Sequence, residues 1–132
     1  MFIDASAFCA ILLGESDSDR LVFVIALAES PATSAIAVWE TARALVARQG
    51  VSVATATQDV ENFLGGAGVR IVPIGRVESR LALEAFDRFG KGRHPAALNM
   101  GDCFAYACAR SLGVPLLFKG DDFSQTDIET AG

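Results

Sequence analysis

The feature that most constrains this chain is the alternation of short apolar segments with longer segments of helical periodicity. The short segments have the length and composition of buried strands, and the longer ones begin near polar caps and end near glycines. This order predicts an α/β fold with a parallel sheet covered by helices on both faces. The predicted strands are residues 2–3, 33–35, 69–74 and 114–118, and the predicted helices are residues 5–13, 16–29 (capped by Ser16), 38–49, 52–64 (closed by a glycine-rich loop at 65–68), 77–89 and 101–112.

Length and composition indicate a small soluble protein. The 132 residues suit a single domain, 1–132, with a core of its own. The longest apolar run, residues 21–28, is far shorter than the roughly 18 residues that cross a bilayer, and Asp4 interrupts what would be the apolar part of a leader peptide. Three cysteines and one histidine argue against a disulfide framework and a common zinc site. We therefore expect a cytoplasmic protein with no membrane partner.

The net charge of −5 is opposite to that expected of a protein that binds nucleic acid, because contacts with phosphates need basic side chains. The charge is unevenly distributed, however. From Arg70 to Lys119 there are eight basic residues and four acids, which gives +4, whereas the rest of the chain carries −9. A basic half can hold a polyanion while acids elsewhere carry out chemistry, so the charge permits a nucleic-acid substrate without requiring one.

Acidic residues gather near one predicted edge of the sheet. Asp4 follows the first strand, and Asp121 and Asp122 follow the last. Glu40 lies near the start of the helix after the second strand, and Asp102 opens the helix that leads into the last strand. Because ligands of parallel sheets bind at the carboxyl ends of the strands, these side chains are expected to converge. Carboxylates so close repel by several kcal/mol unless a cation neutralises them, and an all-oxygen ligand set favours Mg²⁺ or Mn²⁺.

Such a metal would activate water and stabilise the charge that develops on a phosphodiester under attack. The residues that the chain lacks exclude other arrangements. His94 is the only histidine, so a two-histidine nuclease is impossible, and neither a GxxxxGK[ST] phosphate loop nor a GxGxxG dinucleotide fingerprint is present. Metal-assisted hydrolysis of a phosphodiester is the chemistry that remains.

The acids and their neighbours also have plain structural interpretations. Asp4, Glu40 and Asp102, taken one at a time, fit helix caps as well as they fit metal ligands. Ser6 is better explained as a helix cap than as a nucleophile. Asn99 can share a helix face with Asp102 or cap its helix. The metal site therefore depends on the acids as a group.

Basic residues cluster at the end of the fifth predicted helix and in the loop that follows it. They are Arg88, Lys91, Arg93 and His94, and Lys119 stands just before the last two acids. A solvated loop is the simpler interpretation of such a cluster, and contacts with the phosphates of a nucleic acid are the alternative. These five residues are the candidates for substrate binding.

Taken together, these residues resemble the PIN-domain family, and within it the VapC-type ribonuclease toxins of type II toxin–antitoxin systems. The resemblance covers the whole chain. A start of two hydrophobic residues and an aspartate is a weak signal, but the ordered set of motifs at these separations is specific. The motifs are Phe2-Ile3-Asp4-Ala5-Ser6-Ala7, Thr33-Ser34-Ala35 running to Glu40, Arg88-Phe89-Gly90-Lys91-Gly92-Arg93-His94, Ala97-Leu98-Asn99-Met100-Gly101-Asp102-Cys103 and Pro115-Leu116-Leu117-Phe118-Lys119-Gly120-Asp121-Asp122-Phe123.

The resemblance implies a three-layer α/β/α fold with a mostly parallel sheet of four to five short strands, the last of them around residues 127–128. It implies a Mg²⁺- or Mn²⁺-dependent endoribonuclease that leaves a 5′-phosphate and a 3′-hydroxyl. Asp4, Glu40 and Asp102 match the family's first three acids, as metal ligands or organisers of the attacking water. Ser6 and Asn99 match the polar residues that support those acids. The five basic residues would then contact RNA.

The fourth acid departs from the family's pattern. Many relatives carry an acid at the position of Gly120, so its catalytic and metal-binding role is expected to pass to Asp122, which keeps the family's Asp-Phe pair, with Asp121 as the substitute. The resemblance also implies a homodimer, an RNA substrate such as transfer or ribosomal RNA, and a VapB-type antitoxin with a segment across the cleft.

Two other functions share most of these residues. A different Mg²⁺-dependent phosphohydrolase would act on small phosphate esters, and would turn over a chromogenic phosphomonoester without cleaving RNA. A catalytically inactive PIN-like binding module would keep the fold only as a scaffold. The loss of one of the four acids would favour that module, and only the fourth acid is displaced. The sequence therefore favours the ribonuclease toxin.

Overall fold

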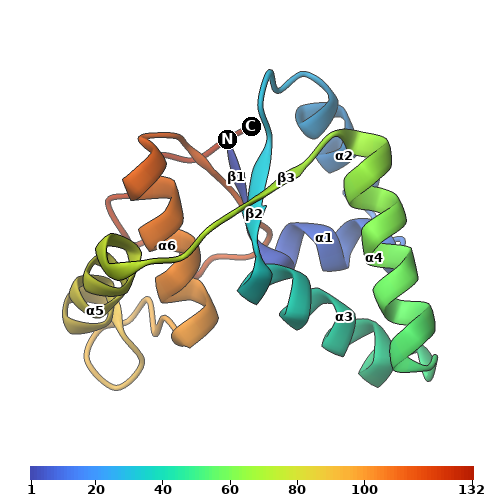
Figure 1. Cartoon of the computed structure of the whole chain (residues 1–132). Coiled ribbons are helices and arrows are strands. Elements are labelled where there is room, and N and C mark those ends of the chain that lie inside the picture. Colours follow the sequence, from blue (N-terminus) through green and yellow to red (C-terminus); the bar gives the residue numbers. More distant parts are fainter.

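A four-stranded, all-parallel sheet lies at the centre of the molecule, in the strand order β3-β2-β1-β4 (Figure 1). The computed structural model describes residues 1–132, and none of its helices has the length and apolar character of a membrane span. The strands are β1 (Phe2–Ile3), β2 (Ala32–Ser34), β3 (Arg70–Val72) and β4 (Leu116–Leu117). The helices are α1 (Ala5–Leu12), α2 (Ser18–Ala26), α3 (Ala35–Gln49), α4 (Val53–Ala67), α5 (Arg76–Phe89) and α6 (Met100–Leu112). This confirms the predicted α/β class.

Successive residues of the neighbouring strands β1 and β4 face different groups of helices. Phe2 and Leu116 belong to the core formed with α5 and α6, whereas Ile3 and Leu117 belong to the core formed with α1 to α4. Neighbouring strand residues point to opposite faces, so a strand of only two residues joins both cores. Figure 1 shows the same division, with α5 and α6 on one side of the sheet and α1, α3 and α4 on the other. The three-layer α/β/α arrangement is confirmed.

Three helices begin at the carboxyl edge of the sheet. Asp4 caps α1 by accepting a hydrogen bond from the backbone N–H of Ser6 at 3.0 Å, and Ser34 caps α3. Asn99 caps α6: its side chain accepts from the N–H of Asp102 at 2.8 Å, and the Asp102 carboxylate accepts from the N–H of Asn99 at 3.1 Å. Figure 1 shows α1 and α3 leaving the lower end of the sheet and α6 starting on the same side.

The starts of two helices differ from the prediction. The predicted cap Ser16 is wrong, because Asp17 holds the N-cap position of α2, and Asp17 is itself paired with Lys119 at 3.1 Å. The third helix begins at Ala35 and not at residue 38. Its cap Ser34 lies ahead of the first large side chains of the amphipathic pattern, so the periodicity located the helix but missed its first turn.

Two further predictions are wrong. Gly65 and Gly66 are helical, because Leu64 is buried in the core and its packing outweighs the low helix propensity of glycine; the helix ends only at Gly68, which has a φ of 65°. No strand forms at residues 127–128. The C-terminal segment meets the sheet through a single parallel bridge between Leu116 and Thr130.

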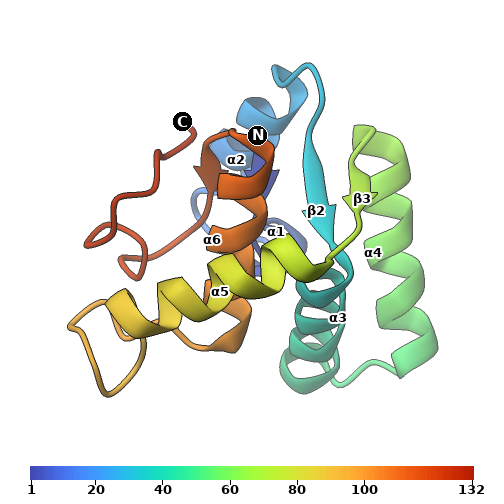
Figure 2. The ribbon, with the colours of Figure 1, turned by 60° about the vertical axis from the view of Figure 1, so that its left-hand side comes forward.

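Asp127 anchors the C-terminal segment to α5 and α6. The Tyr106 hydroxyl donates to Asp127 Oδ1 at 2.6 Å, and the guanidinium groups of Arg88 and Arg110 lie 3.1 Å and 3.7 Å from Asp127 Oδ2. These hydrogen bonds and charges hold the pKa of Asp127 below its usual value, with the Tyr106 bond as the largest cause. Figure 2 shows the segment running beside α6, on the side away from α4. The anchor therefore fixes the segment that carries Asp122.

We predict that Asp127→Ala lowers the free energy of unfolding by about 1–2 kcal/mol, because the buried Tyr106 hydroxyl loses its acceptor and two arginines lose a partly exposed partner. Chemical denaturation measures this loss. Amide hydrogen exchange should accelerate over residues 119–131 and change little in the sheet. Tyr106→Phe is the matched variant that leaves the arginine pairs in place, so its effect should be smaller. Unchanged stability and exchange in Asp127→Ala would contradict the anchoring role.

Candidate active site

Four of the five predicted acids come together at the carboxyl edge of the sheet. Asp4 and Asp102 are buried and Glu40 is half-buried. Burial raises the pKa of Glu40 to about 7, and the charges of Asp4 and Asp102 add to the rise. Burial likewise raises the pKa of Asp102 to about 6, with contributions from the charges of Asp4 and Asp122. The carboxylates are therefore near enough to oppose one another's ionisation.

The side chain of Asp4 is held in place by hydrogen bonds from Ser6. The Ser6 hydroxyl donates to Asp4 Oδ2 at 2.6 Å, and it accepts from the backbone N–H of Lys119 at 3.0 Å. The prediction that Ser6 caps the helix is wrong, because Asp4 takes that position itself. Burial raises the pKa of Asp4, while the two hydrogen bonds from Ser6 act in the opposite direction. The serine thus ties the end of β4 to the carboxylate at the end of β1.

Asp102 is oriented by Asn99 through the reciprocal hydrogen bonds that cap α6. These bonds orient its carboxylate at the N-terminus of the helix, where the partial positive charge favours an anion. Glu40 reaches the same edge from the second turn of α3, since it is the sixth residue of that helix. The three acids therefore come from three different helices that meet at one edge.

Asp122, and not Asp121, affects the ionisation of the other acids. The charge of Asp122 raises the pKa of both Asp4 and Asp102, whereas Asp121 has no such effect on either. The Asp121 carbonyl accepts from the N–H and hydroxyl of Ser124 at 3.1 Å and 2.6 Å, which turns the chain. Phe123 is buried next to this turn and holds Asp122 at the edge of the site.

The acids lie near one another, but their side chains are not arranged as a complete set of metal ligands. No group of three or more histidine, cysteine, aspartate or glutamate side chains is placed as ready ligands of one ion. The only basic side chain that lowers the pKa of one of these carboxylates by its charge is Arg43, which acts on Glu40. A cluster of carboxylate oxygens with so little positive charge beside it has the chemistry of a site for a hard cation.

Gly101 is a residue that the sequence analysis did not single out for the site. The Glu40 carboxylate lies against its Cα, so that a Cβ at this position would come within 2.1 Å of Glu40 Oε2. The signal available in the sequence was a glycine directly before Asp102 in the first turn of a helix, where the backbone needs no glycine.

The five basic candidates differ in whether they form ion pairs with acids of the chain. Three form ion pairs: Arg88 with Asp127, Arg93 with Asp87, and Lys119 with Glu15 and Asp17. His94 accepts a hydrogen bond at Nδ1 from the N–H of Ala96 at 3.0 Å. Lys91 is exposed and forms no ion pair. Ion pairing reduces the positive charge that the three paired residues offer to a phosphate.

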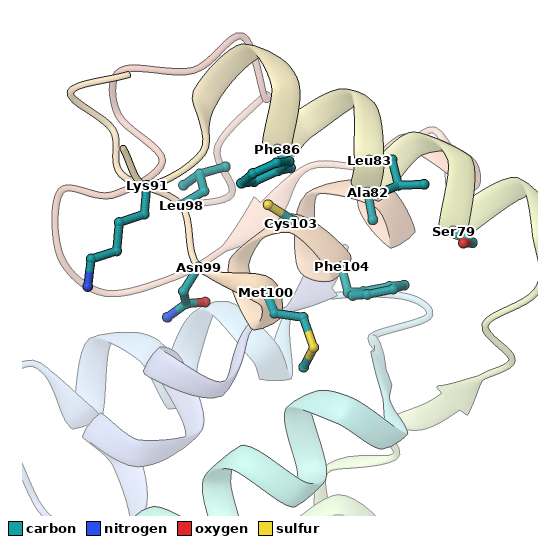
Figure 3. Close-up of a pocket in the computed structure, with 10 residues that line it drawn as sticks. All are labelled: Ser79, Ala82, Leu83, Phe86, Lys91, Leu98, Asn99, Met100, Cys103 and Phe104. Atoms are coloured by element: carbon teal, nitrogen blue, oxygen red, sulfur yellow. The ribbon is translucent and has the colours of Figure 1, made fainter. Parts of the chain in front are cut away.

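A hollow of about 410 Å³ adjoins the site between α5 and the start of α6 (Figure 3). Its lining is mostly apolar, and Phe86, Leu98, Met100 and Phe104 contribute to it. Figure 3 shows Lys91 and Asn99 at one end of this hollow. Since its lining contains no acid and no base besides Lys91, the hollow has no group for hydrolysis, and the acid edge is the candidate active site.

A family model for the PIN domain matches residues 1–129, and the chain belongs to the PIN-domain family. Its curated relatives include VapC ribonuclease Mb0640 of Mycobacterium bovis, which is 38% identical over 130 residues, covering 98% of this chain and 97% of the relative. Ribonuclease VapC of Mycolicibacterium smegmatis is 39% identical over 128 residues, covering 97% of each. The crystal structure of Mycobacterium tuberculosis VapC20, a sarcin–ricin loop cleaving toxin, matches with a TM-score of 0.72 at 20% identity, covering 99% of this chain and 98% of that one, and shows the shared fold.

The raised pKa values of Glu40 and Asp102 predict how the stability of the protein depends on pH. In the folded protein Glu40 has a pKa of about 7 and Asp102 a pKa of about 6, above their usual values of 4.5 and 3.8. In this window the folded state holds more protons than the unfolded state, so stability falls as the pH rises. We predict that the Tm in buffer with EDTA decreases between pH 5 and pH 8.

Glu40→Gln is the matched control for that measurement, because it keeps the shape of the side chain and removes its charge. Its Tm should depend less on pH than that of the parent protein over the same range. A Tm that rises from pH 5 to pH 8 in the parent protein, or an equal slope in the variant, would contradict the assigned protonation.

Proposed function

We propose that this protein is a metal-dependent endoribonuclease that acts as the toxin of a VapBC-type pair. The observation that carries the proposal is the convergence of Asp4, Glu40, Asp102 and Asp122 on one edge of a PIN-domain sheet. Full-length relatives named as VapC ribonucleases support the choice of RNA as the substrate. Transfer RNA and ribosomal RNA are both candidate substrates.

Asp4 and Asp102, with Glu40 and Asp122, would hold Mg²⁺ or Mn²⁺. Their carboxylate oxygens are the donors that these ions prefer, and no soft ligand competes directly at the acid edge, since the neighbouring Cys9 has a pKa raised to about 11, chiefly by burial, and stays a thiol. When bound, such an ion lowers the pKa of water and stabilises negative charge on a phosphodiester.

The chain's own residues orient the acids and move the proton. Ser6 fixes the rotation of Asp4 by its 2.6 Å hydrogen bond, and the Asn99 N–H fixes that of Asp102 at 3.1 Å. Glu40, whose half-buried carboxylate lies near Asp4 and Asp102, is the candidate to accept a proton from the attacking water. Asp122 completes the site from the C-terminal segment.

Binding of the substrate is assigned to the exposed cations beside the site. Lys91 is the best placed of the five, because it forms no ion pair and stands beside Asn99 in Figure 3. His94 is the next candidate in the same loop. Arg88, Arg93 and Lys119 would have to exchange their acidic partners for phosphates. The family further supports a VapB-type antitoxin as inhibitor, a homodimer and a cytoplasmic location as parts of the proposal.

We predict that antitoxin-free protein cleaves RNA with Mg²⁺ or Mn²⁺ and not with excess EDTA, and that Asp4→Asn lowers the rate on the order of 100-fold or more. Gel analysis of total RNA and mapping of 5′-phosphate ends measure this. Cleavage that survives EDTA and Asp4→Asn would overturn the metal-dependent nuclease. Turnover of a chromogenic phosphomonoester without RNA cleavage would support a different phosphohydrolase.

The two adjacent acids of the C-terminal segment provide a matched pair of variants. Asp122→Asn should lower the rate of RNA cleavage about 10-fold or more, since only Asp122 interacts with Asp4 and Asp102. Asp121→Asn should leave the rate within about 2-fold, because the turn uses its backbone carbonyl. The reverse ranking would assign the fourth acid to Asp121.

A further inference from the structure

Gly101 is the second residue of α6, and it is buried against the side chain of Glu40 on α3. A Cβ built on Gly101 would lie 2.1 Å from Glu40 Oε2 and 2.4 Å from both its Cδ and its Oε1. Real Cβ atoms do not approach other heavy atoms so closely, so any other residue here would force the Glu40 carboxylate to move.

The backbone gives no other reason for glycine at this position. Gly101 is not among the residues with positive φ, and it lies in a regular helix, where glycine is about 1 kcal/mol less favourable than alanine. The helical glycines of α4 differ in this respect: a Cβ at Gly65 or Gly66 would meet nothing within 4 Å. The room for a carboxylate is therefore what distinguishes Gly101.

We propose that Gly101 is a positioning residue, whose missing side chain lets the Glu40 carboxylate reach the edge where Asp4 and Asp102 lie. The adjacent residue Asp102 belongs to the same acid cluster, so one turn of α6 supplies a ligand and makes space for a second acid. This inference rests on the proposed nuclease function for its catalytic consequence, but the contact itself can be tested without RNA or metal.

The contact is tested by a double-mutant cycle on the Tm of the protein in EDTA, with the parent, Gly101→Ala, Glu40→Ala and the combined variant. In the Glu40→Ala background, Gly101→Ala should raise the Tm, because the space is free and alanine favours the helix. In the parent background its effect should differ by several degrees, because the carboxylate is displaced. Equal effects in both backgrounds would overturn the contact.

The catalytic consequence is tested by RNA cleavage with Mn²⁺. Gly101→Ala should lower the rate on the order of 100-fold, as misplacement of a catalytic group by about 1 Å does. Gly66→Ala is the matched control, since it makes the same change in an exposed helical turn with open space, and it should cleave like the parent. Parental activity in Gly101→Ala would overturn the positioning role. If the double-mutant cycle shows coupling between Gly101 and Glu40 but the parent protein cleaves no RNA, the contact stands and the proposed nuclease function is rejected.

Discussion

Repulsion among carboxylates at one edge of the sheet is the interaction on which the rest of this structure depends. Asp4 and Asp102 are buried and Glu40 is half-buried; the charge of Asp4 raises the pKa of both Glu40 and Asp102, and the charge of Asp102 raises that of Glu40. Part of this cost is offset by the helices, because Asp4 and Asp102 both accept backbone hydrogen bonds at helix N-termini, where the dipole favours negative charge. Protons at low pH or a cation at neutral pH can remove the remaining repulsion, and the nuclease proposed above would use the cation.

The fold brings these acids together from four distant parts of the chain. Strands of two residues are enough in β1 and β4, because one residue of each strand packs into each of the two helical cores. The link from the Lys119 N–H through Ser6 to Asp4 joins the last strand to the first, and the Asp127 anchor holds the segment that carries Asp122. The acid edge therefore depends on long-range contacts, and damage to the C-terminal segment should reach the site.

Much of this arrangement was accessible from the sequence, since strand–helix alternation predicted the parallel sheet and placed Asp4 and Asp102 at its carboxyl edge. The cap role of Asn99 followed from its spacing to Asp102 in the same way. Contacts between segments far apart in the chain were not accessible. The hydrogen-bond partners of Ser6 and the space at Gly101 depend on how one element packs on another, and local sequence patterns do not reveal that packing. The same holds for the ion pair between Arg88, a candidate for phosphate binding, and Asp127.

The measurement that tests the central claim most directly is anomalous X-ray diffraction from crystals grown with Mn²⁺. The account predicts an anomalous peak at bonding distance from the carboxylates of Asp4 and Asp102, at the carboxyl edge of the sheet. Crystals of Asp4→Asn, grown in the same way, should lose or greatly weaken that peak. An edge that stays empty at saturating Mn²⁺, or a peak only at the Glu15–Asp17 turn, would contradict the claim that the clustered acids share a cation.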